Sequence, residues 1–246
     1  MPWQPLAADW SQDRSAVHVF RLSVANLLDE ARLADLLPDY ERQRAQRLRF
    51  ARPRRQFLAA RVALRQLLGH WVNADPWALT FAIGPHGKPR LEHAAAPEFN
   101  LSHSGDWVAV AIADRQPVGI DVEAVDHSVS RDRLAERYFS VTEQAELSGL
   151  PDEQRWSAFY RGWTCKEAWI KATGRGMGFA VERLTVRLCP HSPAELCEIA
   201  GDVAEASRWQ IVAHAAADDA PLAVCTSRPV AAWRWWDADG LLPENA

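Results

Sequence analysis

The sequence predicts an α+β fold. Helical and strand-like segments are interleaved along the 246 residues, and the strand pair around residues 114–117 has the pattern of an antiparallel hairpin. A hydrophobic content of 48% and a charged content of 24% are ordinary for a globular protein. This length allows one large domain or two smaller ones of roughly 120 residues.

The first part of the chain predicts a strand followed by helices. Residues 17–22 alternate between apolar and polar side chains as a strand does, and residues 27–37 read as a helix that ends before Pro38. Pro53 suits the first turn of a helix. One apolar helical stripe follows it, made of Ala60, Leu64, Leu67 and Trp71.

The middle of the chain predicts strands joined by loops. Residues 79–83 form a short strand, and the glycines and prolines of residues 84–89 indicate a loop. Residues 107–113 are short and apolar, as a buried strand is, and 114–117 turn the chain into residues 118–123. We therefore expect the last two strands to pair with each other.

The last part of the chain predicts three helices and then strands. Residues 132–139 and 142–147 read as helices. Asp152 can cap a long helix that runs to Thr173, with Gly174 as its C-terminal stop. The later strand candidates are residues 183–188, 209–215 and 221–227.

Composition excludes several classes of protein. The net charge of −4 argues against a general nucleic-acid binder. The four cysteines contain no C-x-x-C pair, so neither a zinc site nor a disulfide framework is indicated. No apolar run is long enough for a membrane span, and no signal peptide is visible. We expect a reduced, cytoplasmic, soluble protein.

One stretch of the chain is strongly basic. From Glu41 to Arg55 the chain carries seven arginines: Arg42, Arg44, Arg47, Arg49, Arg52, Arg54 and Arg55. Such a run is a solvated face, a nucleic-acid patch or a site for a phosphorylated ligand.

Residues 118–123 separate into two faces if they form a strand. Val118, Ile120 and Val122 share one face, which reads as core, and Gly119, Asp121 and Glu123 share the other. Carboxylates at i and i+2 lie about 6–7 Å apart at their Cα atoms, close enough to bind one divalent cation.

A third carboxylate, Glu167, lies one helical turn before Lys171. Hard oxygen ligands with nearby lysines suggest a magnesium–phosphate site. Each piece alone has an ordinary explanation. An Asp-x-Glu strand is usually a solvated edge, a Glu–Lys pair at i, i+4 supports a helix surface, and residues 102–104, Ser-His-Ser, suit a turn.

In combination and in this order, these pieces are far more specific. The chain resembles the surfactin-type 4′-phosphopantetheinyl transferases, which have an N-[IL]-S-H-S segment, a G-[IV]-D-[IV]-E strand and a W-x-x-K-E-[AS]-x-x-K helix. The matching residues are 100–104, 119–123 and 163–171. A Gly-rich turn at 174–176 and an upstream Gly-Lys-Pro at 87–89 extend the resemblance, which spans roughly residues 40–190.

The resemblance implies a pseudo-dimer of two similar α+β halves with the active site between them. The halves would be residues 1–117 and 118–246. It implies transfer of the 4′-phosphopantetheine arm of coenzyme A to a serine of an apo carrier protein, with release of 3′,5′-ADP. Asp121, Glu123 and Glu167 would hold Mg²⁺. Glu167 would also accept the serine proton, directly or through water, and Lys171 would neutralise the transferring phosphoryl group.

The resemblance also implies a set of groups that bind coenzyme A. Ser102, His103 and Lys166 are expected at its phosphates, and the Gly87-Lys88-Pro89 loop at its adenine end. Arg47, Arg54, Arg55 and Arg61 are further phosphate candidates, although the match to the family pattern slips around Pro53.

Two other functions compete for the same residues. Ser102, His103 and Asp106 suggest a His-dependent acyltransferase, but no G-x-S-x-G segment accompanies them, and Asp121, Glu123 and Glu167 would be idle. A non-catalytic module that binds coenzyme A or a carrier is the second alternative. The expected partners are apo acyl or peptidyl carrier proteins, with no nucleic acid and no membrane, and the protein is expected to be a monomer.

Overall fold

The computed structural model describes residues 2–25, 29–227 and 230–242. The first half contains β1 (Gln4–Pro5), β2 (Ala16–Ser23), α1 (Glu30–Leu36), α2 (Asp39–Gln46), α3 (Ala51–Val72), β3 (Phe81–Ile83), β4 (Pro89–Leu91), β5 (Glu98–Ser104) and β6 (Trp107–Ala113). The second half contains β7 (Val118–Val122), α4 (Arg131–Tyr138), α5 (Val141–Gly149), α6 (Asp152–Thr173), β8 (Leu184–Val186), β9 (Leu196–Ile199), α7 (Val203–Ala206), β10 (Gln210–Ala217), β11 (Ala220–Thr226) and β12 (Ala232–Asp237).

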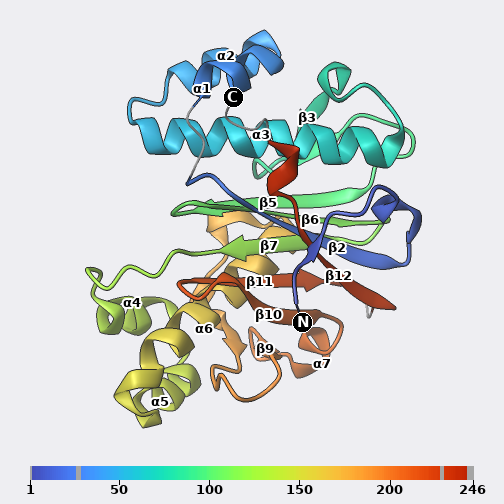
Figure 1. The fold of residues 1–246 in the computed structure, drawn as a ribbon. Coiled ribbons are helices and arrows are strands. Elements are labelled where there is room, and N and C mark those ends of the chain that lie inside the picture. Colours follow the sequence, from blue (N-terminus) through green and yellow to red (C-terminus); the bar gives the residue numbers. More distant parts are fainter. Residues whose placement is uncertain (1, 26–28, 228–229, 243–246) are drawn as a thin grey trace.

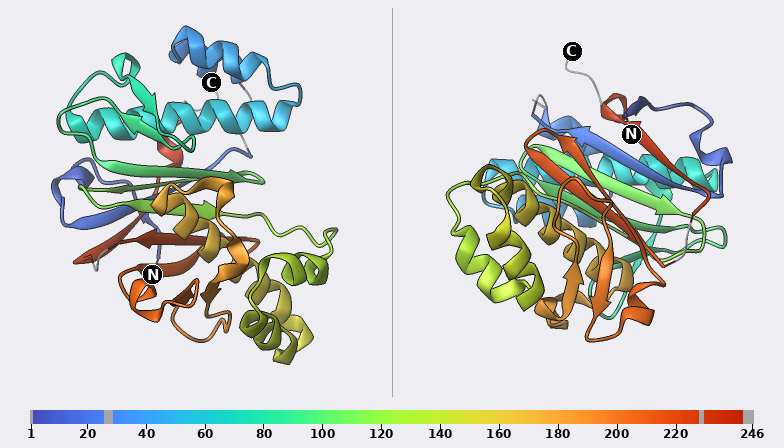
Figure 2. Two further views of the ribbon diagram at one scale, coloured as in Figure 1. Left: turned by 180° about the vertical axis from the view of Figure 1, so that it is seen from behind. Right: turned by 90° about the horizontal axis from the view of Figure 1, so that it is seen from below.

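The expected α+β class is confirmed, and the elements form four layers. A sheet in the order β1-β12-β2-β6-β5 packs on a second sheet in the order β10-β11-β7. Helix α3 covers the outer face of the first sheet, and α6 covers the outer face of the second (Figures 1 and 2). A core of small and branched residues, among them Val19, Ala111, Ile120 and Val224, fills the space between the sheets.

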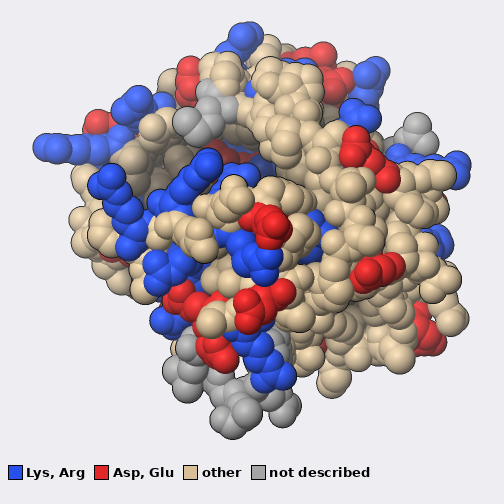
Figure 3. Space-filling view, turned by 90° about the horizontal axis from the view of Figure 1, so that it is seen from above, with Lys and Arg blue, Asp and Glu red and all other residues tan. Residues whose placement is uncertain are grey.

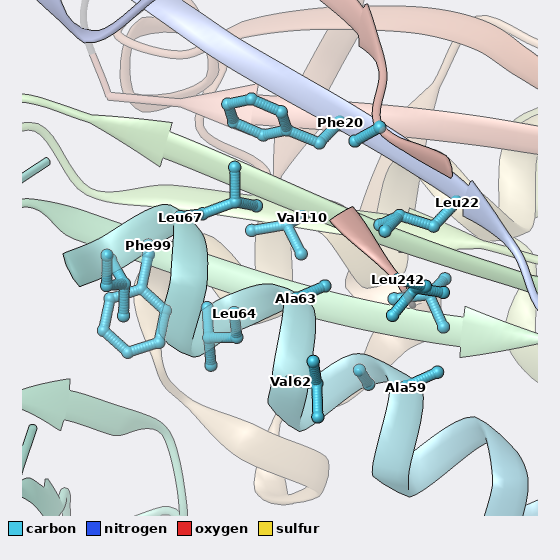
Figure 4. Packing of buried hydrophobic residues seen from close by; sticks show 14 of the residues in the cluster. Phe20, Leu22, Ala59, Val62, Ala63, Leu64, Leu67, Phe99, Val110 and Leu242 are labelled. Carbon is cyan, nitrogen blue, oxygen red and sulfur yellow. The ribbon is translucent and has the colours of Figure 1, made fainter. Parts of the chain in front are cut away.

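The core under α3 follows the predicted stripe. Ala60, Leu64, Leu67 and Trp71 are all buried. Leu64 and Leu67 lie in the same cluster as Phe20, Phe99 and Val110 of the sheet below (Figure 4). Because strand residues alternate between faces, β2 and β6 contribute one set of side chains to this cluster and the other set to the core between the sheets.

The predicted hairpin between residues 107–113 and 118–123 is wrong. Strand β6 pairs with β2 and β5, while β7 pairs antiparallel with β11 in the other sheet. The Asn100–Ser104 region extends as β5, and the chain turns into β6 at Gly105, whose φ is +59°. Because β5 pairs with one edge of β6 and β2 with the other, both edges of β6 are occupied. Residues 114–117 therefore carry the chain from one sheet to the other.

The helix predicted at residues 27–37 is α1, which begins at Glu30; its expected first residues, 27 and 28, lie outside the described residues. Helix α6 ends at Thr173 before Gly174, as predicted, but its N-cap is Pro151 and Asp152 is its first residue. The last strand, β12, was not predicted. It joins the sheet of the first half, parallel to β1 and β2. A division of the chain at 117/118 stays a prediction.

Candidate functional site

The site forms where α6 lies directly on β7. Gly119 allows this approach, because a Cβ at this position would overlap the carbonyl oxygen of Ala168 and the backbone nitrogen of Ala172. Gly119 lies on the same face of β7 as Asp121 and Glu123. The missing side chain therefore brings the helix that carries Glu167 and Lys171 onto the face that carries the two other carboxylates.

Asp121 is the most buried of these carboxylates, with 3% of its surface exposed. Its Oδ1 accepts hydrogen bonds from Lys171 Nζ at 2.6 Å and from the Ser102 hydroxyl at 3.0 Å. Burial raises the pKa of Asp121 to about 7, against the opposing charge of Lys171, and the charges of Glu123 and Glu167 add to the rise. Within the described residues, its Oδ2 is buried and has no hydrogen-bond partner.

Glu123 has both of its oxygens occupied by protein donors. Its Oε2 accepts from the Ser104 hydroxyl at 2.7 Å, and its Oε1 accepts from the Trp163 indole nitrogen at 3.3 Å. Glu167 is half-buried. Burial raises the pKa of Glu167 against the opposing charge of Lys171, and Glu123 adds to the rise. The three carboxylates therefore interact electrostatically.

The donor set suits a hard divalent cation, although it is not assembled as a ligand cluster. Within the described residues, no group of three or more His, Cys, Asp and Glu side chains is arranged to hold a metal ion. The positive charge next to Asp121 is the ammonium of Lys171. The buried Oδ2 without a partner, with two further carboxylates acting on the same group, nevertheless fits a cation that prefers oxygen ligands.

Strand β5 reaches this site from the other sheet through side chains. Asn100 Oδ1 accepts from the Ile120 backbone nitrogen at 2.9 Å, and the Ser102 hydroxyl, which donates to Asp121, accepts from Lys171 Nζ at 2.9 Å. Ser102 therefore lies beside Asp121 and Lys171. Ser102 is buried, and its hydroxyl already makes hydrogen bonds within the protein. Its role in holding a phosphate stays a prediction.

His103 points to the opposite face of β5 from Ser102, since strand side chains alternate. Its side chain is exposed at the surface. Partial loss of solvent around the ring, together with the charge of Lys171, lowers the pKa of His103. The neutral imidazole is therefore favoured near neutral pH.

Lys166 does not reach the site. It is fully buried, and its ammonium contacts Glu143 Oε2 at 2.6 Å and the carbonyl oxygens of Tyr138 and Val181 at 2.9 and 3.2 Å. Residues 166 and 167 lie about 100° apart around a helix, so Lys166 faces α5 while Glu167 faces β7. This placement contradicts the expected contact of Lys166 with the phosphates of coenzyme A.

The Gly87-Lys88-Pro89 loop lies against the C-terminal end of α6. Lys88 Nζ donates to the carbonyl oxygens of Val118 at 3.0 Å and of Ala172 at 3.4 Å. The Gly-rich turn after α6 accommodates this loop, because a Cβ at Gly176 would lie 3.2 Å from His86 Cβ. The loop of the first half is therefore fastened to the helix of the second half beside Lys171.

Most of the predicted arginines are already paired with carboxylates. Arg54 and Arg55 contact Glu30, and Arg61 contacts Glu41. Arg47 is exposed and is the C-cap residue that follows α2. Viewed from the α3 side, Lys and Arg side chains gather around a hollow in the surface (Figure 3). A role for these arginines in binding phosphate stays a prediction.

Three contributors to the site were not assigned from the sequence: Asn100, Ser104 and Gly119. The signal for the first two was available, because Asn100, Ser102 and Ser104 repeat with the period of a strand and so form one polar face. The role of Gly119 depends on the position of α6, which no local pattern fixes.

Comparison with known proteins gives a consistent result. Residues 117–225 match the family described as 4′-phosphopantetheinyl transferase superfamily, and residues 29–115 match 4′-phosphopantetheinyl transferase, N-terminal. The chain is 36% identical to the 4′-phosphopantetheinyl transferase HetI of Nostoc sp., over 79% of this chain and 83% of that protein. It is 34% identical to 4′-phosphopantetheinyl transferase psf-1 of Bacillus pumilus, over 78% of this chain and 79% of that protein. For 4′-phosphopantetheinyl transferase Sfp of Bacillus subtilis the identity is 29%, over 65% of this chain and 70% of that protein.

Proposed function

The chain belongs to the 4′-phosphopantetheinyl transferase superfamily and is an enzyme of this kind, and from that premise we propose that it transfers the phosphopantetheine arm of coenzyme A to a serine of an apo carrier protein. The other product is 3′,5′-ADP. The observation that supports this best is the junction of the halves. Ser102 of the first half and Lys171 of the second both contact the Oδ1 of Asp121.

In the proposed reaction, the carrier serine oxygen attacks the β-phosphorus of the pyrophosphate. A new P–O bond forms, the bond to the 3′,5′-ADP oxygen breaks, and the serine proton goes to a base. Glu167 is the candidate base, because burial raises its pKa and strengthens it as a proton acceptor. Lys171 is placed to neutralise negative charge on the transferring phosphoryl group.

Asp121, Glu123 and Glu167 are the residues that would hold Mg²⁺. Bound there, the cation would stabilise the negative charge of the pyrophosphate. His103, the loop at residues 87–89 and the arginines of α2 and α3 are the proposed contacts to coenzyme A, and an acidic carrier would be attracted to the same arginines.

No helix of the described residues has the length and apolar character that a membrane crossing needs. The remaining expectations, a monomer that acts in the cytoplasm without nucleic acid, form part of this proposal.

Mass spectrometry of several apo carrier proteins tests the proposal directly. After incubation with the protein, coenzyme A and Mg²⁺, a carrier should gain about 340 Da, the mass of the phosphopantetheine arm. EDTA should prevent the gain. No gain on any carrier, with a known transferase active on the same carriers, would overturn the proposed function.

Substitution of His103 separates the transferase from the acyltransferase alternative. His103→Ala should raise the KM for coenzyme A more than it lowers kcat, because a phosphate contact acts on substrate and transition state alike. An acyltransferase that uses His103 as its base predicts the reverse. The structure favours the first outcome, since Asp106 is directed to Arg52 at 3.4 Å.

Glu167→Gln tests the role of the third carboxylate. If Glu167 only binds the cation, additional Mg²⁺ should restore much of the rate. If it is the base, the rate should stay about 10²-fold lower at saturating Mg²⁺. We expect partial rescue. A rate that does not respond to the substitution would contradict both roles and reduce the Glu167–Lys171 pair to a contact on the helix surface.

A further inference from the structure

Ser104 belongs to the first half, and it holds a carboxylate of the second. The Ser104 hydroxyl lies 2.7 Å from Glu123 Oε2, and Trp163 Nε1 lies 3.3 Å from Glu123 Oε1. Both oxygens of Glu123 thus have a protein donor, whereas Oδ2 of Asp121 has none within the described residues. The protein fixes the orientation of Glu123 by itself and leaves one buried oxygen of Asp121 without a hydrogen-bond donor among the described residues.

The direction of the Ser104 proton is determined by a second contact. The backbone nitrogen of Ala124 donates to Ser104 Oγ at 3.0 Å, so one lone pair of the hydroxyl oxygen is occupied. A hydroxyl has a single proton, and the carboxylate at 2.7 Å is the acceptor it faces. The result is a charge-assisted hydrogen bond with a fixed donor, which is stronger than a bond between neutral groups.

The position of Ser104 is in turn fixed by α3. Gln56 Nε2 donates to the carbonyl oxygen of Gly105 at 2.5 Å, and Gln56 is buried. Gly105 has a φ of +59°, and a Cβ there would lie 2.5 Å from Ala124 Cβ. The turn after Ser104 is therefore held between the first long helix and the segment that follows β7, with no room for a side chain at Gly105.

We infer that Ser104 is a positioning residue: it holds the Glu123 carboxylate in the orientation that a divalent cation requires. The inference rests on the proposed function, in which Glu123 binds that cation. Groups that orient a metal ligand typically change metal affinity 10- to 100-fold when they are removed. The first half thus contributes to the metal site without supplying a ligand.

Mn²⁺, measured by electron paramagnetic resonance with and without coenzyme A, is the probe. Ser104→Ala should raise the Kd for Mn²⁺ about tenfold, and Ser104→Thr, which retains the hydroxyl, should restore it. Thr226→Val is the matched control. It removes a buried hydroxyl that donates to Gln116 at the far end of the β7–β11 pair from Glu123, and should leave the Kd unchanged.

A purely structural role for Ser104 predicts lower melting temperatures for both Ser104→Ala and Thr226→Val, with the same Mn²⁺ affinity as the wild type. That result would overturn the inference and leave the transfer reaction standing. Failure of the wild type to bind Mn²⁺ would also overturn it. Absence of the mass gain on every carrier, in contrast, would remove the proposed function whatever the Mn²⁺ data show. In the transfer assay, Ser104→Ala should need about ten times more Mg²⁺ for half-maximal rate.

Discussion

The two halves of the molecule solve the same packing problem with different residues. In each half a 22-residue helix covers a sheet, and one buried cation of that helix pairs with a glutamate of a preceding short helix. In the first half Arg65 contacts Glu41 at 2.7 Å, and in the second Lys166 contacts Glu143 at 2.6 Å. Both cations also donate to backbone carbonyl oxygens.

The halves differ in how closely the long helix approaches its sheet. Large side chains such as Leu64 and Leu67 separate α3 from the strands below it. Gly119 allows α6 to touch the backbone of β7. The first half contributes stability and the polar strand β5, which lies next to β7. The second half contributes the carboxylates Asp121, Glu123 and Glu167 and the lysine Lys171. Two similar architectures thus differ in that the proposed metal-binding and base residues all belong to the second half.

The buried pairs give the largest expected effect. Lys166→Met should destabilise the protein by about 3–5 kcal/mol, because it leaves Glu143 buried without its cation. Arg65→Met should cost less, because Arg61 still contacts the buried Glu41. Lys166→Met/Glu143→Gln should recover most of the loss. Urea unfolding measures all three. If Lys166→Met lowered activity in the folded protein while leaving stability unchanged, Lys166 would belong to the site and the likeness between the halves would fail.

Asp121→Asn should separate stability from activity. The rate of transfer should fall about 10²–10³-fold, the usual cost of removing one stabilising group from a transition state. Burial raises the pKa of Asp121 to about 7, because a buried charge is costly. Asn carries no charge and avoids this cost, so the melting temperature should stay the same or rise. Phosphopantetheine transfer and a thermal melt give the two values. A destabilised Asp121→Asn variant with normal activity would mean that Asp121 supports the fold and not the transfer reaction.

Gly119→Ala tests the close approach of α6. The added methyl group would overlap the helix backbone, and overpacking of this kind costs about 1–3 kcal/mol or more. Gly149→Ala is the matched control, since nothing lies within 4 Å of a Cβ there and α5 should gain about 0.5–1 kcal/mol. Equal stability of the two variants in urea unfolding would show that α6 shifts without cost.

The smallest expected effect depends on pH and belongs to the first half. His18 is fully buried, and its Nδ1 accepts from Trp236 Nε1 at 3.1 Å, which leaves Nε2 to donate to the carbonyl oxygen of Asp13. Burial lowers the pKa of His18. Below the unfolded pKa of about 6.5, the unfolded chain therefore takes up a proton that the folded protein excludes.

The contribution of His18 to stability is thus complete above pH 6.5 and is lost as the pH falls. Between pH 6.5 and 5.5 the free energy of unfolding should decrease by about 1 kcal/mol more in the wild type than in His18→Gln. Urea titrations at the two pH values measure the difference. Parallel curves for the two proteins would mean that His18 is protonated in the folded state.

The sequence predicted the local elements better than their pairing. The alternation of Val118–Val122 and the length of α6 follow from side-chain period and from a stop at Gly174, which are local properties. The partner of β7 was wrong because strand pairing depends on which edges other segments already occupy. Lys166 was misplaced for a related reason. Its position next to Glu167 in the motif says nothing about the glutamate of α5 that buries it.

The position of β12 has a consequence for the order in which the protein is made. This strand lies between β1 and β2, so Ala232 pairs with Ala16 across more than 200 residues. On the ribosome, β2 keeps one edge unpaired until β12 has been synthesised. An open strand edge is a template for pairing with other chains. The first half therefore stays open to misassembly until β12 pairs with β2 and covers this edge.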